Sequence, residues 1–144
     1  MTKRGQWHIE FFNEYDALQL QYPNQRQNTA NIKLNYGLAH KFEADVDSPY
    51  LSIHRAEGNH SSAGVGDTNL GIKKTFRDES STSRLPALAA SFYVEFPTGD
   101  VSQQLGSGLR DYWLNLIAQK SLSSETRITA NLGYVCVSCR GGVQ

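Results

Sequence analysis

Apolar and polar residues alternate along most of this 144-residue chain. The clearest case is "TANIKLNYGLAH", in which every second residue from Ala30 to Leu38 is apolar and the residues between them are polar or glycine. A period of two places successive side chains on opposite faces of a β-strand. The pattern therefore predicts a strand with one apolar face and one polar face.

Comparable runs occur seven times, and short polar or glycine-rich segments separate them. They are "QWHIEFFNEYDALQLQ", "TANIKLNYGLAH", "KFEADVDSPYLSIHR", "DTNLGIKKTFRDE", "LPALAASFYVEFPTG", "RDYWLNLIAQK" and "TRITANLGYVCVS". No segment shows the convincing period of a helix. Because consecutive strands with short links usually pair as neighbours, we predict an all-β fold, an antiparallel up-and-down meander of about seven strands.

Two places interrupt this regular pattern. Pro49 has no backbone donor for a central ladder, so we expect the third run to bend there, or to end and restart. The segment "AEGNHSSAGVGD", residues 56–67, has the composition of a loop. We therefore expect the fourth strand to begin only at Asp67.

Alternation alone does not say which face meets water. In a soluble lipocalin-like barrel, the apolar parity points inward and encloses a small hydrophobic ligand. In a membrane barrel, the same residues face lipid and the polar parity lines a hydrated lumen. A helical membrane protein is excluded, because no apolar run approaches the ~20 residues that a spanning helix needs. The mean hydropathy of -0.49 does not separate the two barrels, since membrane strands are only mildly apolar on average.

Two features favour the membrane barrel. Several runs keep their parity for about nine or ten residues, whereas an ordinary strand has about five or six. A tilted strand of that length covers ~20–25 Å, which matches the apolar band of an outer-membrane barrel. Aromatic residues also fall on the apolar parity, several of them near run ends, where amphipathic rings meet lipid headgroups. We therefore expect an outer-membrane type of β-barrel.

In such a barrel, one of the two alternating sets of residues faces the lumen and the other faces lipid. The residues expected to line the lumen are Asn31, Lys33, Asn35, Glu43, Asp45, Asp67, Asn69, Lys73, Glu95, Asp111, Asn115 and Asn131. The residues expected to face lipid are Ile32, Leu34, Tyr36, Leu70, Ile72, Phe92, Val94, Leu114, Leu116, Leu132 and Tyr134. For each polar residue alone, the simpler hypothesis is exposed surface or, for Asp67 and Asp111, capping of a turn. The shared register of all seven runs favours a lumen.

Residues that could bind nucleic acid or metal, or that could catalyse a reaction, give no reason to change the expected barrel. Lysine plus arginine equal aspartate plus glutamate at 14 each, so nothing points to nucleic acid. Cys136 and Cys139 form one C-x-x-C pair without the second pair or the helix start that zinc or redox sites need. A third hypothesis is an enzyme with a Ser/His pair, and "GNHSSAG" around His60 is the best segment for it. No nucleophile, base and orienting group share a motif, so we expect neither catalysis nor a cofactor.

Four motifs carry a resemblance to a known family. "GVGDTNLGIKKTF", "LPALAASFYVEFPTGD", "LGSGLRDYWLNLIAQKSL" and "TANLGY" follow one another in this order. Together they resemble the bacterial family of outer-membrane transporters associated with the meta-pathway of phenol degradation. The resemblance implies an antiparallel barrel in the outer membrane and a channel for small, aromatic or hydrophobic compounds, with no catalytic residues.

The resemblance covers residues 7–134, and the tail 135–144 departs from the family pattern. We expect residues 1–144 to form one β-barrel domain or a fragment of one, since the family continues into further strands and the N-terminus shows no secretory signal. Its expected location is the bacterial outer membrane, and its expected partners are membrane lipid and an unidentified small molecule. Open strand edges would also favour self-association.

Overall fold

The computed structural model describes residues 2–18, 25–39, 41–55, 61–80 and 84–137. Eight strands and one short 3-10 turn make up the regular structure of this part of the chain. The strands are β1 (Trp7–Leu18), β2 (Gln25–Ala39), β3 (Phe42–Arg55), β4 (Ser62–Val65), β5 (Thr68–Arg77), β6 (Ala87–Phe96), β7 (Asp111–Ser121) and β8 (Arg127–Val137), and the 3-10 turn is η1 (Val101–Gln103). No helix in these ranges is long and apolar enough to cross a membrane.

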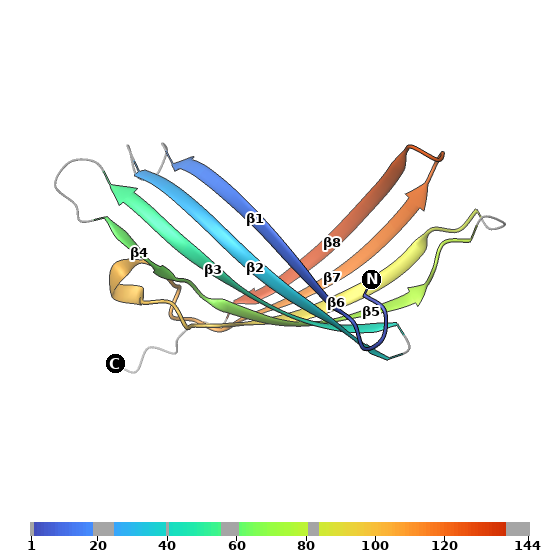
Figure 1. The fold of residues 1–144 in the computed structure, drawn as a ribbon, viewed down its shortest axis with the longest axis horizontal. Coiled ribbons are helices and arrows are strands. Elements are labelled where there is room, and N and C mark those ends of the chain that lie inside the picture. The colour runs from blue at the N-terminus through green and yellow to red at the C-terminus, as the bar shows by residue number, and fades with distance from the viewer. Residues whose placement is uncertain (1, 19–24, 40, 56–60, 81–83, 138–144) are drawn as a thin grey trace.

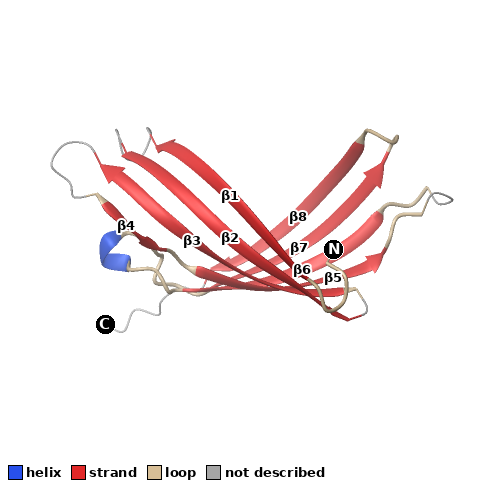
Figure 2. Ribbon diagram, viewed as in Figure 1, coloured by secondary structure: helices blue, strands red, loops and turns tan. Residues whose placement is uncertain are grey.

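The strands form one antiparallel sheet in the order β1-β2-β3-β5-β6-β7-β8, with β4 paired to β3 beside this path. The sheet curls into a half-barrel, with β1 to β3 on one wall and β6 to β8 on the other (Figure 1, Figure 2). The predicted all-β antiparallel meander is therefore confirmed. Within the described residues, β1 and β8 each pair with one neighbouring strand only.

β4 and β5 are two parts of one strand position, which explains why eight strands correspond to seven predicted runs. Both pair antiparallel with β3, β4 through Tyr50↔Val65 and β5 through Asp47↔Asn69. The two pairings differ by one residue in register, as at a β-bulge, and the break between them falls at Gly66 and Asp67. The amide of Gly66 still donates to the carbonyl of Pro49 at 2.8 Å.

Two sequence predictions are wrong here. The segment predicted as a loop contains β4, because small residues after Ser61 complete the hairpin with the end of β3. β3 also continues through Pro49, so the alternative that the third run ends and restarts there is wrong. The irregularity that Pro49 requires lies instead in the neighbouring strand, where the bulge at Gly66 faces it.

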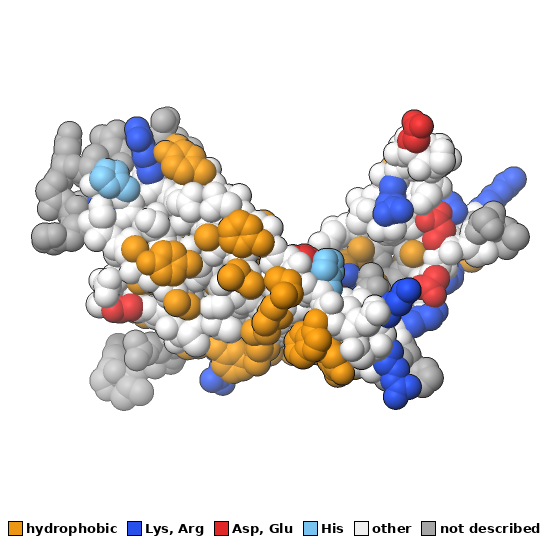
Figure 3. Space-filling view, in the orientation of Figure 1, with side chains coloured by type: hydrophobic (Ala, Val, Ile, Leu, Met, Phe, Trp, Pro, Cys, Tyr) orange, Lys and Arg blue, Asp and Glu red, His pale blue; other side chains and the backbone are white. Residues whose placement is uncertain are grey.

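Burial in this sheet is the reverse of that in an ordinary globular protein. Among the described residues, the only buried hydrophobic side chains are those of Ile53 and Leu105. Seven polar or charged residues are buried: Gln25, Asn31, Asn35, Glu43, Asp45, Ser62 and Ser91. Hydrophobic side chains gather instead on the outward surface of β1 to β3 (Figure 3).

Glu79 joins the segment between β5 and β6 to the end of β7. Its carboxylate lies 2.9 Å from Nζ of Lys120 and accepts hydrogen bonds from the amide and the hydroxyl of Ser121. The ammonium of Lys120 and the two donors of Ser121 lower the pKa of Glu79 from 4.5 to about 2. The ionised carboxylate therefore ties this segment to the end of β7.

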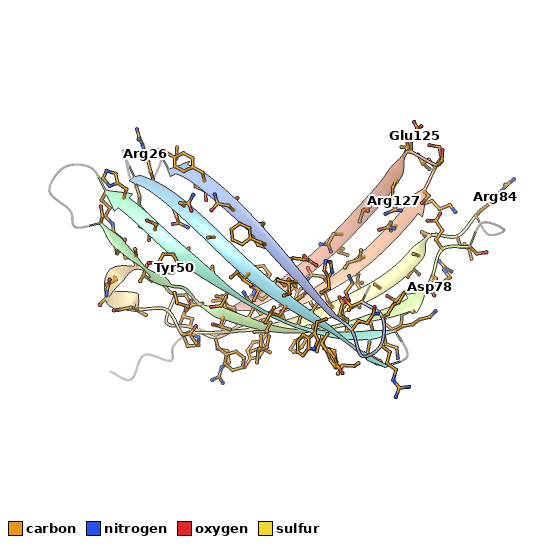
Figure 4. The ribbon with its side chains drawn as sticks, viewed as in Figure 1. Arg26, Tyr50, Asp78, Arg84, Glu125 and Arg127 are labelled. Carbon is orange, nitrogen blue, oxygen red and sulfur yellow. The ribbon has the colours of Figure 1, made fainter. Side chains whose placement is uncertain are left out.

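We expect Glu79→Gln to lower the unfolding temperature at neutral pH and to have little effect near pH 2. The folded pKa of about 2 lies below the ordinary 4.5, so the stabilisation is complete above pH 4.5 and is lost as the pH falls towards 2. Thermal unfolding of both proteins from pH 7 to pH 2 measures this. Glu125→Gln, in the exposed turn between β7 and β8 (Figure 4), removes the same charge elsewhere and should leave the difference between high and low pH unchanged.

Candidate functional site

The concave face of the sheet is identified by contacts that cross it. Nζ of Lys33 in β2 donates to the hydroxyl of Tyr93 in β6 at 3.1 Å, although β3 and β5 lie between these two strands. Side chains with two strands between them converge in this way where the sheet curls towards them. We call the face that carries Lys33, Asp45 and Tyr93 the inner face, and the opposite one the outer face.

The pairing register arranges the inner face in rows that run across the strands. One row, the carboxylate row, consists of Glu10, Lys33, Asp47, Asn69, Glu95 and Asp111 on β1 to β7, and Val137 of β8 lies beside Asp111 at its end. The next row consists of His8, Asn35, Asp45, Gly71, Tyr93 and Trp113, and Val135 of β8 lies beside Trp113. A third consists of Gly37, Glu43, Lys73, Ser91, Asn115 and Gly133. The polar residues of six or seven strands therefore share one surface.

Lys33, Asp45 and Tyr93 form the most enclosed cluster on this surface. Nζ of Lys33 lies 2.9 Å from Oδ1 of Asp45 and 4.8 Å from the centre of the Tyr93 ring. The side chain of Asp45 is 1% exposed and that of Lys33 is 21% exposed. A charge so well buried is tolerated only with a partner, which Lys33 supplies.

Gly71 makes room for this cluster. A Cβ at this position would lie 2.3 Å from Cε1 of Tyr93 and 2.8 Å from Oδ1 of Asp45. Both distances are shorter than a carbon atom allows, so any side chain here would push the Tyr93 ring away from Lys33. The glycine in the "NLGI" segment is therefore explained by the close approach of a ring from the next strand.

Amide side chains hold two further carboxylates of the inner face, those of Asp47 and Glu10. Nδ2 of Asn69 donates to Oδ1 of Asp47 at 3.1 Å, and Nδ2 of Asn31 lies 3.5 Å from the same oxygen. Asn35 donates to Oε1 of Glu10 at 3.0 Å. These amides orient the carboxylates without neutralising them.

The outer face carries the apolar parity. All eleven residues predicted to face lipid lie on it: Ile32, Leu34, Tyr36, Leu70, Ile72, Phe92, Val94, Leu114, Leu116, Leu132 and Tyr134. Ring contacts join Trp7 to Tyr36, with centroids 4.6 Å apart, and Phe92 to Tyr112. Large side chains remain exposed here, with Leu132 at 71% and Phe11 at 69%.

The inner face holds eleven of the twelve residues predicted to line a lumen, and Asp67 is the exception. Asn31, Lys33, Asn35, Glu43, Asp45, Asn69, Lys73, Glu95, Asp111, Asn115 and Asn131 share the inner parity. The inner face also carries Tyr93 and Trp113, which the predicted lumen residues do not include because those were chosen for polar side chains. Strict counting from Asp111 along β7 would have placed Trp113 with the polar residues.

Asp67 organises the loop between β6 and β7. Its carboxylate accepts from the amides of Gly99 at 2.9 Å and Ser107 at 2.7 Å. The hydroxyl of Thr98 donates to the carbonyl of Gly66 at 2.9 Å. The "GVGD", "PTGD" and "GSG" motifs, far apart in sequence, thus form one structural unit, and Asp67 has the capping role that was its simpler interpretation.

The same loop packs against β4 on the inner side. A Cβ on Gly64 would lie 2.8 Å from Cδ1 of Leu105, so Leu105 fills the space that this glycine leaves. Ser62 donates to the carbonyl of Gln103 at 2.8 Å, and the Arg55 guanidinium donates to Oε1 of Gln104 at 2.6 Å. The loop therefore covers part of the inner face where β6 has already ended.

The candidates for other chemistry do not form a site. The hydroxyl of Ser61 lies 3.2 Å from Nδ1 of His54, but both side chains are exposed and, within the described ranges, no carboxylate orients the imidazole. His60 and Cys139 lie outside the described residues, and Cys136 is exposed on β8. No group of three or more metal-ligating side chains is found in the described part of the chain.

Comparisons with known proteins add no family to this geometry. No model of a known protein family matches the chain, and no curated protein matches it. The resemblance carried by the four motifs stays a prediction.

We expect Lys33→Met to lower the free energy of unfolding by about 3–5 kcal/mol, because it leaves the Asp45 carboxylate buried without a counter-charge. The double variant Lys33→Met with Asp45→Asn should recover most of that loss. Urea unfolding of the refolded proteins in detergent measures both. Lys41→Met is the matched control, since Lys41 pairs with Asp78 where both side chains are well exposed and the expected cost is about 0–1 kcal/mol.

We expect Asp67→Ala to loosen the loop between β6 and β7, since two backbone donors lose their acceptor at about 1–3 kcal/mol each. Limited trypsin digestion should then cleave after Arg110 faster than in the parent protein. Asp67→Asn keeps one acceptor oxygen and should give an intermediate rate. Equal cleavage of all three proteins would contradict the role assigned to this carboxylate.

Proposed function

We propose that this chain forms the wall of an outer-membrane β-barrel that lets small solutes pass by diffusion. The observation that carries the proposal is the inversion of burial: buried carboxylates and amides lie on the concave face, and most of the exposed large apolar side chains lie on the convex face. Asn35 is 3% exposed and Ser91 is 4% exposed, whereas Trp7 is 67% exposed. Lipid around the sheet and water within it would give each face the environment that it favours.

The extent of the apolar surface supports the same proposal. Exposed Phe, Ile, Leu, Trp or Tyr side chains occur on every long strand of the described sheet, and β3 contributes one of them, Tyr50. A soluble monomer rarely exposes a continuous apolar patch of more than a few hundred Å². The strands of the main path have 10 to 15 residues, and a tilted strand needs about 9–11 to cross the hydrocarbon core.

A soluble lipocalin-like protein is the alternative, because a curled antiparallel sheet also suits that fold. Its apolar parity would have to line the concave face and enclose a hydrophobic ligand. The described residues have the opposite arrangement, with Lys33 and Asp45 at the centre of the concave face. This arrangement favours the membrane barrel.

The solute class follows from the resemblance and not from the geometry. The four motifs are similar to those of transporters linked to phenol degradation, which makes small aromatic or hydrophobic compounds the first solutes to test. Tyr93 and Trp113 offer aromatic surface on the inner face, against which such a compound could stack.

The two tryptophans test the proposal directly, since the chain has one on each face. Trp113→Phe leaves only Trp7 on the outer face, and Trp7→Phe leaves only Trp113 on the inner face. After refolding into vesicles of brominated phospholipid, Trp7 fluorescence should be strongly quenched by the lipid. Trp113 should instead be quenched by acrylamide added to the water.

Two other results would count against the membrane barrel. Quenching of Trp113 by the brominated chains, with Trp7 protected from them, would overturn the proposal. A soluble monomer that folds without detergent and binds an apolar dye would favour the lipocalin-like alternative. A change in migration on unheated detergent gels would show whether each variant has folded before its fluorescence is compared.

A further inference from the structure

The inner face is acidic although the whole chain is neutral. By register, its acidic residues are Glu10, Glu14, Asp16, Glu43, Asp45, Asp47, Glu95 and Asp111, and its basic residues are Lys33, Arg55, Lys73 and Arg127. Eight acidic residues thus face four basic ones, while the full sequence has 14 of each kind. The pairing register, not the composition, produces this excess of negative charge.

The excess is concentrated in the carboxylate row. The only basic residue of that row, Lys33, directs its ammonium to Asp45 at 2.9 Å, in the neighbouring row. Asp47, Glu95 and Asp111 make no ion pair with any described residue. Glu95 lies within the electrostatic reach of Asp47, Asp67 and Asp111 at once. Negative charges therefore gather here without a counter-charge from the described residues.

A buried amide next to the row points to the kind of ligand that would satisfy it. Asn31 is 9% exposed, and its Nδ2 approaches Asp47 while no described residue donates to its Oδ1. Oδ1 of Asp111 is also buried and receives no hydrogen bond from the described part of the chain. Carboxylate and amide oxygens that lack a donor can accept from the hydration water of a cation or bind the cation itself, whereas they repel an anion.

We propose that the carboxylate row, with Oδ1 of Asn31 beside it, attracts hydrated monovalent cations and small organic cations to the inner face and disfavours anions. This inference rests on the proposed function, because it requires that water reaches the inner face. Rings of acidic side chains select cations in pores by the same electrostatics, which low-dielectric walls strengthen. The row would act on cationic solutes and leave neutral ones unaffected.

Trp113 lies close enough to the carboxylate row for its fluorescence to report on the electrostatic potential there. It follows Asp111 by two residues on the inner parity of β7, which corresponds to roughly 7 Å along the strand. The distance is shorter than the Debye length of about 10 Å at 0.1 M salt. A charged quencher near Trp113 therefore samples the potential of the row.

The experiment compares quenching of Trp113 by caesium, iodide and acrylamide in the Trp7→Phe protein, refolded in detergent at constant ionic strength. We expect the Stern–Volmer constant for caesium, relative to its value for free tryptophan, to exceed that for iodide by a factor of about two or more. Glu95→Gln and Asp111→Asn, made singly, should each reduce this ratio. Glu125→Gln, whose side chain lies at the turn between β7 and β8 (Figure 4), removes the same charge away from the row and should leave the ratio unchanged.

Acrylamide separates failure of this inference from failure of the proposed function. If acrylamide does not quench Trp113, water does not reach the inner face, and both proposals fall. If acrylamide quenches Trp113 but iodide is as effective as caesium, the inner face is wet without selecting cations, and only this inference is overturned. A caesium preference that persists in both row variants would also overturn it.

Discussion

Cross-strand register is the constraint on which this structure depends. Side chains alternate with a period of two, so a slip of one residue in any pair of strands would move a whole set of polar groups to the outer face. The rows on the inner face exist because six successive antiparallel pairings keep the same parity from β1 to β8. With only two buried hydrophobic residues among those described, the backbone ladder and these rows hold the sheet together in place of an apolar core.

The bulge at Gly66 shows how the register survives an irregularity. β3 pairs with β4 on one side of the bulge and with β5 on the other, so an extra residue is absorbed without moving Asp47 or Asn69 from the inner face. Asp67, which belongs to the bulge, turns its carboxylate to the loop between β6 and β7. A local departure from the alternation thus fixes the longest loop against the sheet.

The topology also fixes the relative direction of the two edge strands, β1 and β8. Successive antiparallel pairings through seven strand positions leave β1 and β8 pointing in the same direction. Direct pairing between these two edges would be parallel, unlike every other strand pairing in the sheet. In hydrocarbon, unpaired edge groups cost several kcal/mol each, so an odd number of further strand positions would be needed for an all-antiparallel closed barrel.

The sequence by itself determined which residues share a face. Period-two alternation is a local property of each strand, so Ile32 and Leu34 could be separated from Asn31 and Lys33 before any pairing was known. Prediction from the sequence failed where tertiary contacts outweighed the local pattern. Pro49 stays inside a continuous strand because the neighbouring strand bulges, and Ser62–Val65 forms a strand because β3 offers it an edge.

Only the tertiary structure decided which face is concave and which charges meet there. The direction of curling depends on the twist and pairing of all the strands together, and no single run encodes it. The pairing of Lys33 with Asp45 and Tyr93, the space that Gly71 leaves for it, and the carboxylates that remain unpaired follow from contacts between residues distant in sequence. The alternation gave the sheet two faces, and the curl of the sheet made the polar one the inner one.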